Sequence, residues 1–147
     1  MLRSIESQAY IYFAHKSVLS NRSNDEFVFS YGAETIFNEI FHSSSSVLWQ
    51  GYFSGYTSIS GKDYLFRDPM GLSKLYVGKT IEDNFYVSHS WIKLIKAGVK
   101  IDSICAVKPG VIIQYINGNF VQIRELNPPL KSIRLEEIPT MLETRIN

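Results

Sequence analysis

The chain has 147 residues, of which 45% are apolar, which is enough to form one domain around its own core. Its 15 Lys and Arg residues nearly balance 14 Asp and Glu residues and form no basic cluster or stripe, which argues against a nucleic-acid-binding protein. The apolar runs are far shorter than the ~20 residues that cross a bilayer, and the N-terminus carries no signal pattern, so we expect a soluble, cytoplasmic protein with no membrane partner.

Short runs of aromatic and β-branched residues, separated by Gly, Asn, Asp and Ser, predict a strand-rich domain. The predicted strands, in chain order, are Gln8–Ala14, Glu26–Ser30, Gly51–Ser58, Tyr64–Arg67, Lys74–Val77, Phe85–Ser88, Ile101–Val107, Val111–Ile116 and Asn119–Arg124. Asn117-Gly118 predicts a type I′ hairpin between the last two strands, and Ser60–Asp63 predicts a similar turn.

Two segments have helical instead of strand periodicity. In Ala33–His42 and in Ser90–Ala97 the apolar residues fall on one helical face, and Gly98 can close the second helix. After Arg124 the prolines end the strand pattern, and Pro139 suits the first position of a C-terminal helix. We therefore expect a domain over residues 1–130 and a connector helix over residues 131–147.

The lone cysteine and the three histidines point to no special chemistry. Cys105 cannot form a disulfide within the chain, and its flanks predict a strand, so we expect a buried, unreactive thiol. His15, His42 and His89 have unrelated spacings and no neighbouring cysteine, so we expect no metal site. His89 precedes the second predicted helix, where we expect it in a cap region or an interface.

The segment Phe66–Tyr76 runs from a predicted strand into Arg-Asp-Pro-x-Gly-x-x-x-Leu-Tyr. This pattern resembles the class II glutamine amidotransferase domain of the asparagine synthetase and β-lactam synthetase family. Four other pieces follow in the family's order and extend the resemblance over about residues 26–125: Ala33-Glu34-Thr35, Gly51-Tyr52-Phe53, Val87-Ser88-His89 and Lys108-Pro109-Gly110.

The resemblance implies an α+β fold of the Ntn-hydrolase type, a sandwich of two antiparallel sheets with flanking helices, here trimmed at the N-terminus. It gives structural roles to Arg67, Asp68, Gly71, Tyr76, Pro109 and Gly110. Asp68 is expected to bond backbone amides in the turn, and Gly71 and Gly78 are expected to be turn residues with unusual dihedral angles.

The same resemblance implies a lost glutaminase site. In the family an N-terminal cysteine is the nucleophile, and Leu2 stands in its place. The family's glutamine-binding aspartate corresponds to Ala33, and Glu34 beside it is turned by about 100° around the helix. The segment that supplies oxyanion donors has no counterpart at a matching distance. We therefore expect no catalytic residue, no cofactor in this domain, and a degenerate substrate site at Ala33 and Glu34.

These expectations describe a non-catalytic scaffold domain or subunit of an ATP-dependent, amide-forming enzyme, as in macrolactam or β-lactam biosynthesis. The expected partner is a synthetase (ATP-pyrophosphatase) domain that carries ATP and magnesium, with a homodimer as the fallback. Interface candidates are Met141, Leu142 and Ile146 in the tail, together with the sheet edge opened by the trimming. Two other hypotheses stay open: an active glutamine amidotransferase whose nucleophile lies outside this sequence, and a stand-alone protein-interaction module.

Overall fold

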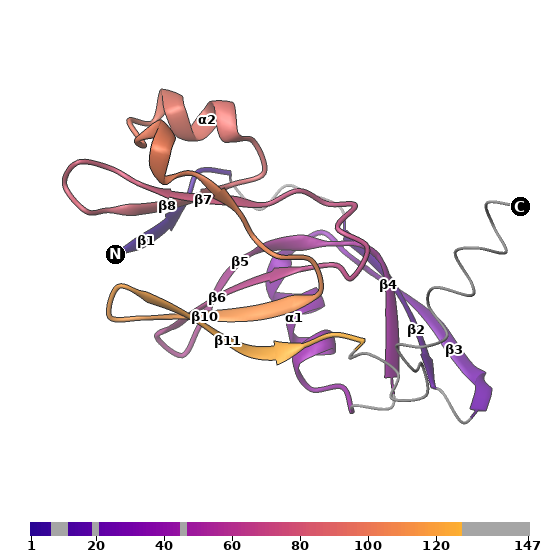
Figure 1. Cartoon of the computed structure of the whole chain (residues 1–147). Coiled ribbons are helices and arrows are strands. Elements are labelled where there is room, and N and C mark those ends of the chain that lie inside the picture. The colour runs from indigo at the N-terminus through magenta and orange to yellow at the C-terminus, as the bar shows by residue number, and fades with distance from the viewer. Residues whose placement is uncertain (7–11, 19–20, 45–46, 128–147) are drawn as a thin grey trace, which may run out of the picture.

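The computed structural model describes residues 1–6, 12–18, 21–44 and 47–127. Most of these residues lie in strands, with two α-helices among them, so the fold is α+β (Figure 1). The strands are β1 (Leu2–Ser4), β2 (Tyr12–Val18), β3 (Asn21–Ser30), β4 (Val47–Tyr52), β5 (Ser54–Ile59), β6 (Lys62–Arg67), β7 (Tyr76–Lys79), β8 (Phe85–Ser88), β9 (Cys105–Ala106), β10 (Val111–Ile116) and β11 (Asn119–Glu125). The helices are α1 (Ala33–Phe41), α2 (Trp91–Lys96) and a 3₁₀ helix at Ile101–Ser103.

The described strands form three sheets. Sheet A has the order β1-β8-β7-β9, sheet B the order β3-β2-β4, and sheet C the order β11-β10-β6-β5. Neighbouring strands are antiparallel except β1 and β8, which run parallel. Two antiparallel sheets were expected, and the third arises because the predicted strand Gly51–Ser58 is interrupted at Phe53. The chain before this break, β4, pairs with β2 in sheet B, and the chain after it, β5, pairs with β6 in sheet C.

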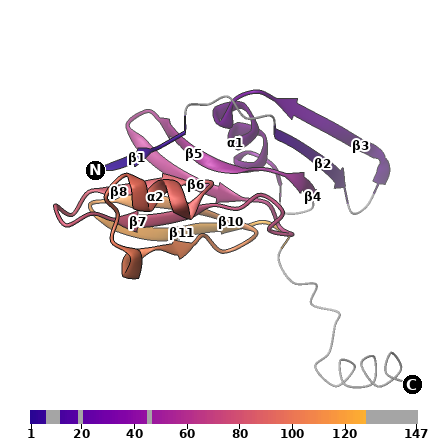
Figure 2. The same ribbon diagram turned by 90° about the horizontal axis from the view of Figure 1, so that it is seen from above.

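Two apolar clusters lie on opposite faces of sheet C, because successive side chains of a strand point to opposite faces. On β6, Tyr64 and Phe66 belong to the cluster that also contains the buried face of α1, and Leu65 belongs to the cluster shared with sheet A. The helix α2 lies over sheet A on the side away from sheet C (Figure 1). Sheet B lies beside α1, as the view from above shows (Figure 2).

The predicted helices Ala33–His42 and Ser90–Ala97 and both predicted hairpin turns are confirmed, and the connector helix predicted over residues 131–147 lies outside the described residues. The buried residues of α1 are Ala33, Ile36, Phe37 and Ile40, and their spacing places them on one face of the helix. Asn117 and Gly118 have φ angles of 48° and 84°, as a type I′ turn requires, and Ser60 and Gly61 have 54° and 75°.

Other predictions from sequence are wrong in detail. Cys105 lies in the short strand β9, as predicted, but it is exposed and not buried. Ile101–Ser103 forms a 3₁₀ helix and not the start of that strand. Gly78 is a strand residue of β7 and not a turn residue, and it is needed for another reason: a Cβ there would lie 2.4 Å from Val99 Cγ1. Most of the predicted strand Gln8–Ala14 falls outside the described residues.

Tyr56 on β5 makes the stability of the domain depend on pH in the alkaline range. Its hydroxyl donates a hydrogen bond to Asp63 Oδ1 at 2.8 Å, and burial, followed by this carboxylate, raises the pKa of Tyr56 from 10.0 to about 12. An unfolded chain releases this proton at lower pH than the folded chain, so the contribution to stability is full below about pH 10 and is lost as the pH rises through about 12.

We expect the urea midpoint of the natural chain to fall between about pH 10 and pH 12 more steeply than that of Tyr56→Phe, which has no proton to lose there. Other ionising groups contribute equally to both proteins, so the difference between the two pH profiles isolates Tyr56. Parallel profiles would contradict the assignment.

Candidate functional site

The Arg67–Asp68 turn begins at the last residue of β6 and starts the loop that leads from sheet C to β7 in sheet A. Arg67 is buried, and its guanidinium donates to three backbone carbonyl oxygens: Ser73 (3.0 Å), Val107 (2.5 Å) and Gly71 (2.9 Å). A buried cation is costly unless its donors are bonded, and here the planar guanidinium bonds three carbonyl oxygens in two separate loops. Arg67 therefore ties the β6–β7 loop to the loop before β10.

Asp68 is completely buried and organises the same turn from within. Its carboxylate oxygens accept hydrogen bonds from the backbone amides of Leu72 and Ser73, both at 2.9 Å, which confirms the amide-bonding role predicted for this residue. The backbone N–H of Asp68 donates to Phe53 O at 2.7 Å, at the point where β4 gives way to β5. The carboxylate of Asp68 thus holds the loop that follows it, and its backbone N–H holds the break between β4 and β5.

The structure brings the other predicted turn residues to the same place. Gly71 has a φ of 67°, and a Cβ there would lie 3.0 Å from both Arg67 Nη2 and Pro109 Cγ. The backbone N–H of Gly110 donates to the carbonyl oxygens of Arg67 and Asp68 at 3.1 and 3.0 Å. Tyr76 lies apart from the turn on β7, opposite Ser88 and Ala106.

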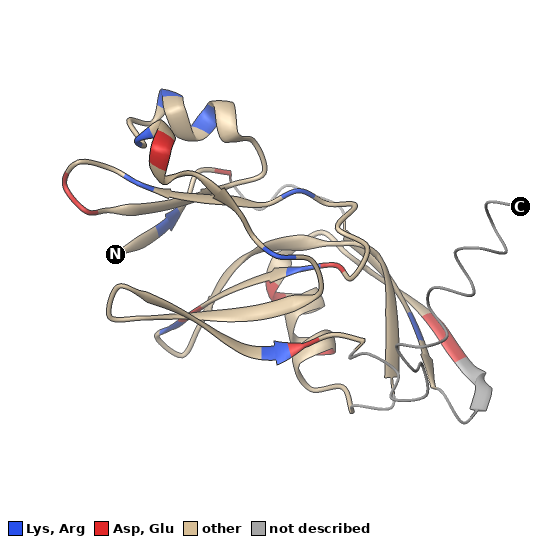
Figure 3. Ribbon diagram, viewed as in Figure 1, with Lys and Arg blue, Asp and Glu red and all other residues tan. Residues whose placement is uncertain are grey.

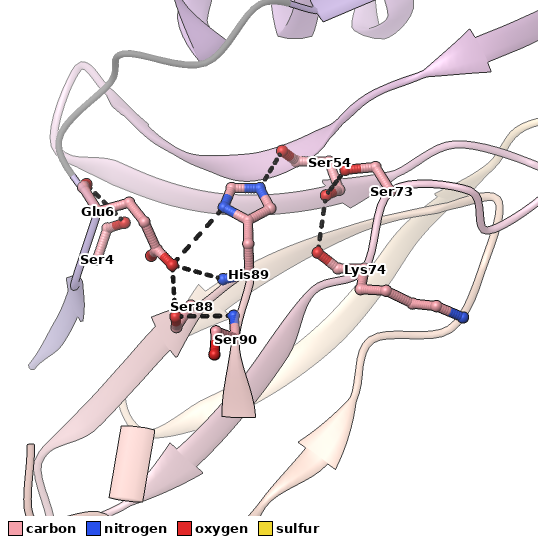
Figure 4. Close-up of polar contacts among 8 residues, drawn as sticks. All are labelled: Ser4, Glu6, Ser54, Ser73, Lys74, Ser88, His89 and Ser90. Carbon is pink, nitrogen blue, oxygen red and sulfur yellow. Dashed lines mark hydrogen bonds and ion pairs between the residues drawn. The ribbon is translucent and has the colours of Figure 1, made fainter. Parts of the chain in front are cut away.

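A polar network extends from this turn to the N-terminal segment (Figure 4). Ser73 contacts Ser54 through their hydroxyl oxygens at 2.6 Å, and the Ser54 carbonyl oxygen lies 2.9 Å from Nε2 of His89. Because a carbonyl oxygen only accepts, Nε2 carries the proton of this bond. His89 is thus held against β5 just before α2 begins, which fits the predicted cap-region or interface position.

Glu6 forms the far end of the network. Its side chain is 5% exposed, and Oε1 accepts hydrogen bonds from Ser88 Oγ at 2.5 Å and from the backbone N–H of His89 at 2.9 Å. The Nδ1 atom of His89 is 4.0 Å from the same oxygen. Within the part of the chain that the structure describes, Glu6 Oε2 is buried without a hydrogen-bond partner. Glu6 therefore fastens the segment after β1 to the end of β8.

The network has the residue types of a hydrolytic triad but not its geometry. A serine nucleophile needs its hydroxyl hydrogen-bonded to a base, and the base needs a third group that orients it. Here the Ser88 hydroxyl donates to Glu6, the Ser54 hydroxyl contacts Ser73, and Nε2 of His89 bonds a backbone oxygen. The arrangement joins four segments of the chain, and within the described residues the hydroxyls of Ser54 and Ser88 bond Ser73 and Glu6.

The positions matched to the family's chemistry lie elsewhere and apart from each other. Leu2 is buried in the cluster between sheets A and C. Ala33 is the first residue of α1 and is buried in the other cluster. Glu34 is exposed. The tail residues Met141, Leu142 and Ile146 lie outside the described residues.

Sequence reasoning missed most of the polar network. Glu6 and Ser54 carried no local signal, because their partners Ser88 and Ser73 are 82 and 19 residues away along the chain. A serine or glutamate that becomes buried through such distant contacts looks like any surface residue in the sequence.

Comparison with known proteins finds no matching family model, no matching curated protein and no matching solved structure. In the described part of the chain, neither α-helix is long and apolar enough to span a membrane.

Proposed function

We propose that this chain is a non-catalytic, amidotransferase-like scaffold that serves an ATP-dependent, amide-forming synthetase of the asparagine synthetase type. The observation that carries the proposal is the burial of Leu2 and Ala33, which are 4% and 2% exposed in two different apolar clusters. A nucleophile and a substrate-binding acid have to face one shared, accessible site. Side chains that fill separate cores cannot do so.

The Arg67–Asp68 turn and the layering of sheets and helices support the same proposal. The Arg67–Asp68 turn is built from buried charges whose donors and acceptors bond the backbone, an arrangement that stabilises a loop without offering groups to a substrate. The order of α2, sheet A, sheet C and α1 is compatible with the layered Ntn-hydrolase sandwich that we propose for this domain. Chemistry would then belong to the partner, which would bind ATP and magnesium.

The proposal predicts that the purified chain releases no ammonia from glutamine above the buffer background. The physical reason is that Leu2 stands in place of the family's nucleophile and is buried, so it offers no group for covalent catalysis. Ammonia should be measured in a coupled assay beside the variant Ser4→Ala, because Ser4 is an exposed hydroxyl residue close to the N-terminus. Turnover that disappears in Ser4→Ala would overturn the scaffold proposal and favour a working amidotransferase.

The scaffold role is tested by sedimentation of the purified chain together with a candidate synthetase (ATP-pyrophosphatase) protein, such as the product of a neighbouring gene of that type. We expect a faster-sedimenting complex that weakens when residues 138–147 are deleted. The reason is that the apolar residues Met141, Leu142 and Ile146 are predicted to form a stripe that no adjacent segment of the sequence would cover. Two independent species, unchanged by the deletion, would exclude docking through the tail and leave the stand-alone interaction module as the better hypothesis.

A further inference from the structure

The outer face of sheet B carries a group of exposed aromatic side chains on the side away from α1. Phe13 on β2 lies opposite both Phe29 on β3 and Tyr52 on β4, so these three residues form a row across the sheet. Phe27 lies two residues from Phe29 on the same strand and therefore on the same face, and Tyr31 follows directly after β3. We call these five residues the aromatic face.

The rings of the aromatic face already contact one another in the single chain. Phe27 and Phe29 stack with their centroids 6.2 Å apart, and Phe13 stacks on Tyr52 at 6.4 Å. His15 lies against Phe27 at 4.9 Å and continues the surface along β2. Because neighbouring rings restrict each other's rotamers, part of the entropy of ordering this surface is lost before any partner arrives.

The exposure of these rings is large for a surface without a partner. Phe27, Phe29 and Tyr31 are 64%, 69% and 76% exposed, and Phe13 and Tyr52 are 39% and 42% exposed. Together they expose the equivalent of about three whole aromatic side chains, which is about 600 Å². This area is at the upper end of the largest apolar patch on an ordinary monomer, about 300–600 Å², and patches of that size are often functional.

One charged residue of β3, Asp25, shares the face of Phe27 and Phe29 and lies beyond Phe27 along the strand. Lys16 on β2 and Glu26 on β3 point to the opposite face, where Lys16 Nζ bonds Glu26 and Glu39 of α1 at 2.7 and 3.5 Å. His15 and Asp25 form a pair at 3.8 Å toward one end of the face. In the coloured parts of these two strands, the charged positions of β2 and β3 lie near one another (Figure 3). A partner that covers the five aromatic residues can therefore leave Asp25, whose side chain is 38% exposed, in water at the margin of the contact.

The geometry points to a second copy of this chain as the occupant: we propose that two copies pack their aromatic faces together across a twofold axis. Such an axis brings the same surface of each copy together, so the surface has to be complementary to itself. The five aromatic residues, which carry no charge, meet this condition. Two faces contribute about 1,200 Å² in total, which is at the lower end of specific protein–protein interfaces. Two sheets packed face to face lie about 10 Å apart, a spacing that aromatic side chains fill.

The two edge strands of sheet B, β4 and β3, favour packing through the aromatic face over the pairing of a strand of the second copy at either edge. The backbone of β4 is already engaged at Trp49, whose N–H and carbonyl oxygen bond the Asn127 side chain at 2.7 and 2.6 Å. Only β3 offers a free edge among the described strands of this sheet, and edge pairing there would leave the aromatic rings in water. Packing through the face covers them.

The test is sedimentation equilibrium of the natural chain and of the double variant Phe27→Ser/Phe29→Ser. We expect a dimer for the natural chain and a dissociation constant at least about 100-fold higher for the variant, because it loses two of the five aromatic side chains, which are 64% and 69% exposed in the single chain. The matched control is Ile81→Ser/Ile101→Ser, which removes two side chains that are 79% and 70% exposed outside sheet B and should leave the dimer intact.

Circular dichroism checks that each variant is folded, and Tyr52→Ser on β4 replaces the double variant if the latter does not fold. A natural chain that is monomeric up to high micromolar concentration overturns the proposal, and so does a dimer that survives both aromatic changes. A monomer that becomes a dimer only when the chain is cut after Asn127 also overturns it, because the tail would then be the occupant of the face. These outcomes do not depend on ammonia release or on binding of a synthetase, so they are separate from the tests of the proposed function.

Discussion

Replacing Arg67 with methionine is expected to lower the free energy of unfolding by about 3–5 kcal/mol. The change removes the donors to the Ser73, Val107 and Gly71 carbonyl oxygens, which stay buried without them, and leaves the Asp68 carboxylate buried with no cation in the same turn. Such a loss is a large part of the stability of an ordinary domain, which is about 5–15 kcal/mol. Urea unfolding followed by tryptophan fluorescence measures it.

The control for this change is Arg3→Met, the same substitution on an exposed strand residue, for which we expect a loss within about 0.5 kcal/mol. Arg67→Lys is the second variant, because an ammonium group keeps the charge but cannot match the planar fork that reaches three carbonyl oxygens. We expect an intermediate loss of about 2 kcal/mol for it. Equal midpoints for Arg67→Lys and the natural chain would show that the fork geometry is not what stabilises the turn.

Replacing Gly71 with valine is expected to cost about 3 kcal/mol or more, for two separable reasons. The first is the φ of 67°, which a β-branched residue adopts only at a cost of about 1–2 kcal/mol. The second is space, because the new Cβ would lie 3.0 Å from Arg67 Nη2 and from Pro109 Cγ, and Arg67 cannot move without losing its hydrogen bonds.

Gly61 provides the matched control for this variant. Its φ of 75° is nearly the same, but a Cβ there would meet nothing within 4 Å. Gly61→Val should therefore lose only the stability that the positive φ costs. The difference between the stability losses of the two variants, about 2 kcal/mol, then measures the packing of Arg67 and Pro109 against Gly71. Thermal unfolding of both variants measures this difference. Equal losses at the two positions would mean that the turn has room for a side chain.

The sequence by itself determined the features that depend on neighbouring residues. The helices α1 and α2 follow from apolar residues on one helical face, and the hairpins at Ser60-Gly61 and Asn117-Gly118 follow from residues that tolerate positive φ. The backbone-bonding role of Asp68 belongs to the same class, since its partners are four and five residues away. Local hydrogen bonds and dihedral preferences are sufficient to decide such features.

The tertiary structure alone decided how these pieces meet. The break at Phe53 that creates sheet B, the parallel pairing of β1 with β8, and the burial of Glu6 beside Ser88 all depend on contacts between residues far apart in the chain. The aromatic face is the clearest case, because alternation along β3 predicts that Phe27 and Phe29 share a face but not whether that face meets a core or solvent. That choice is made by α1, which packs on the other side of sheet B and leaves this face exposed.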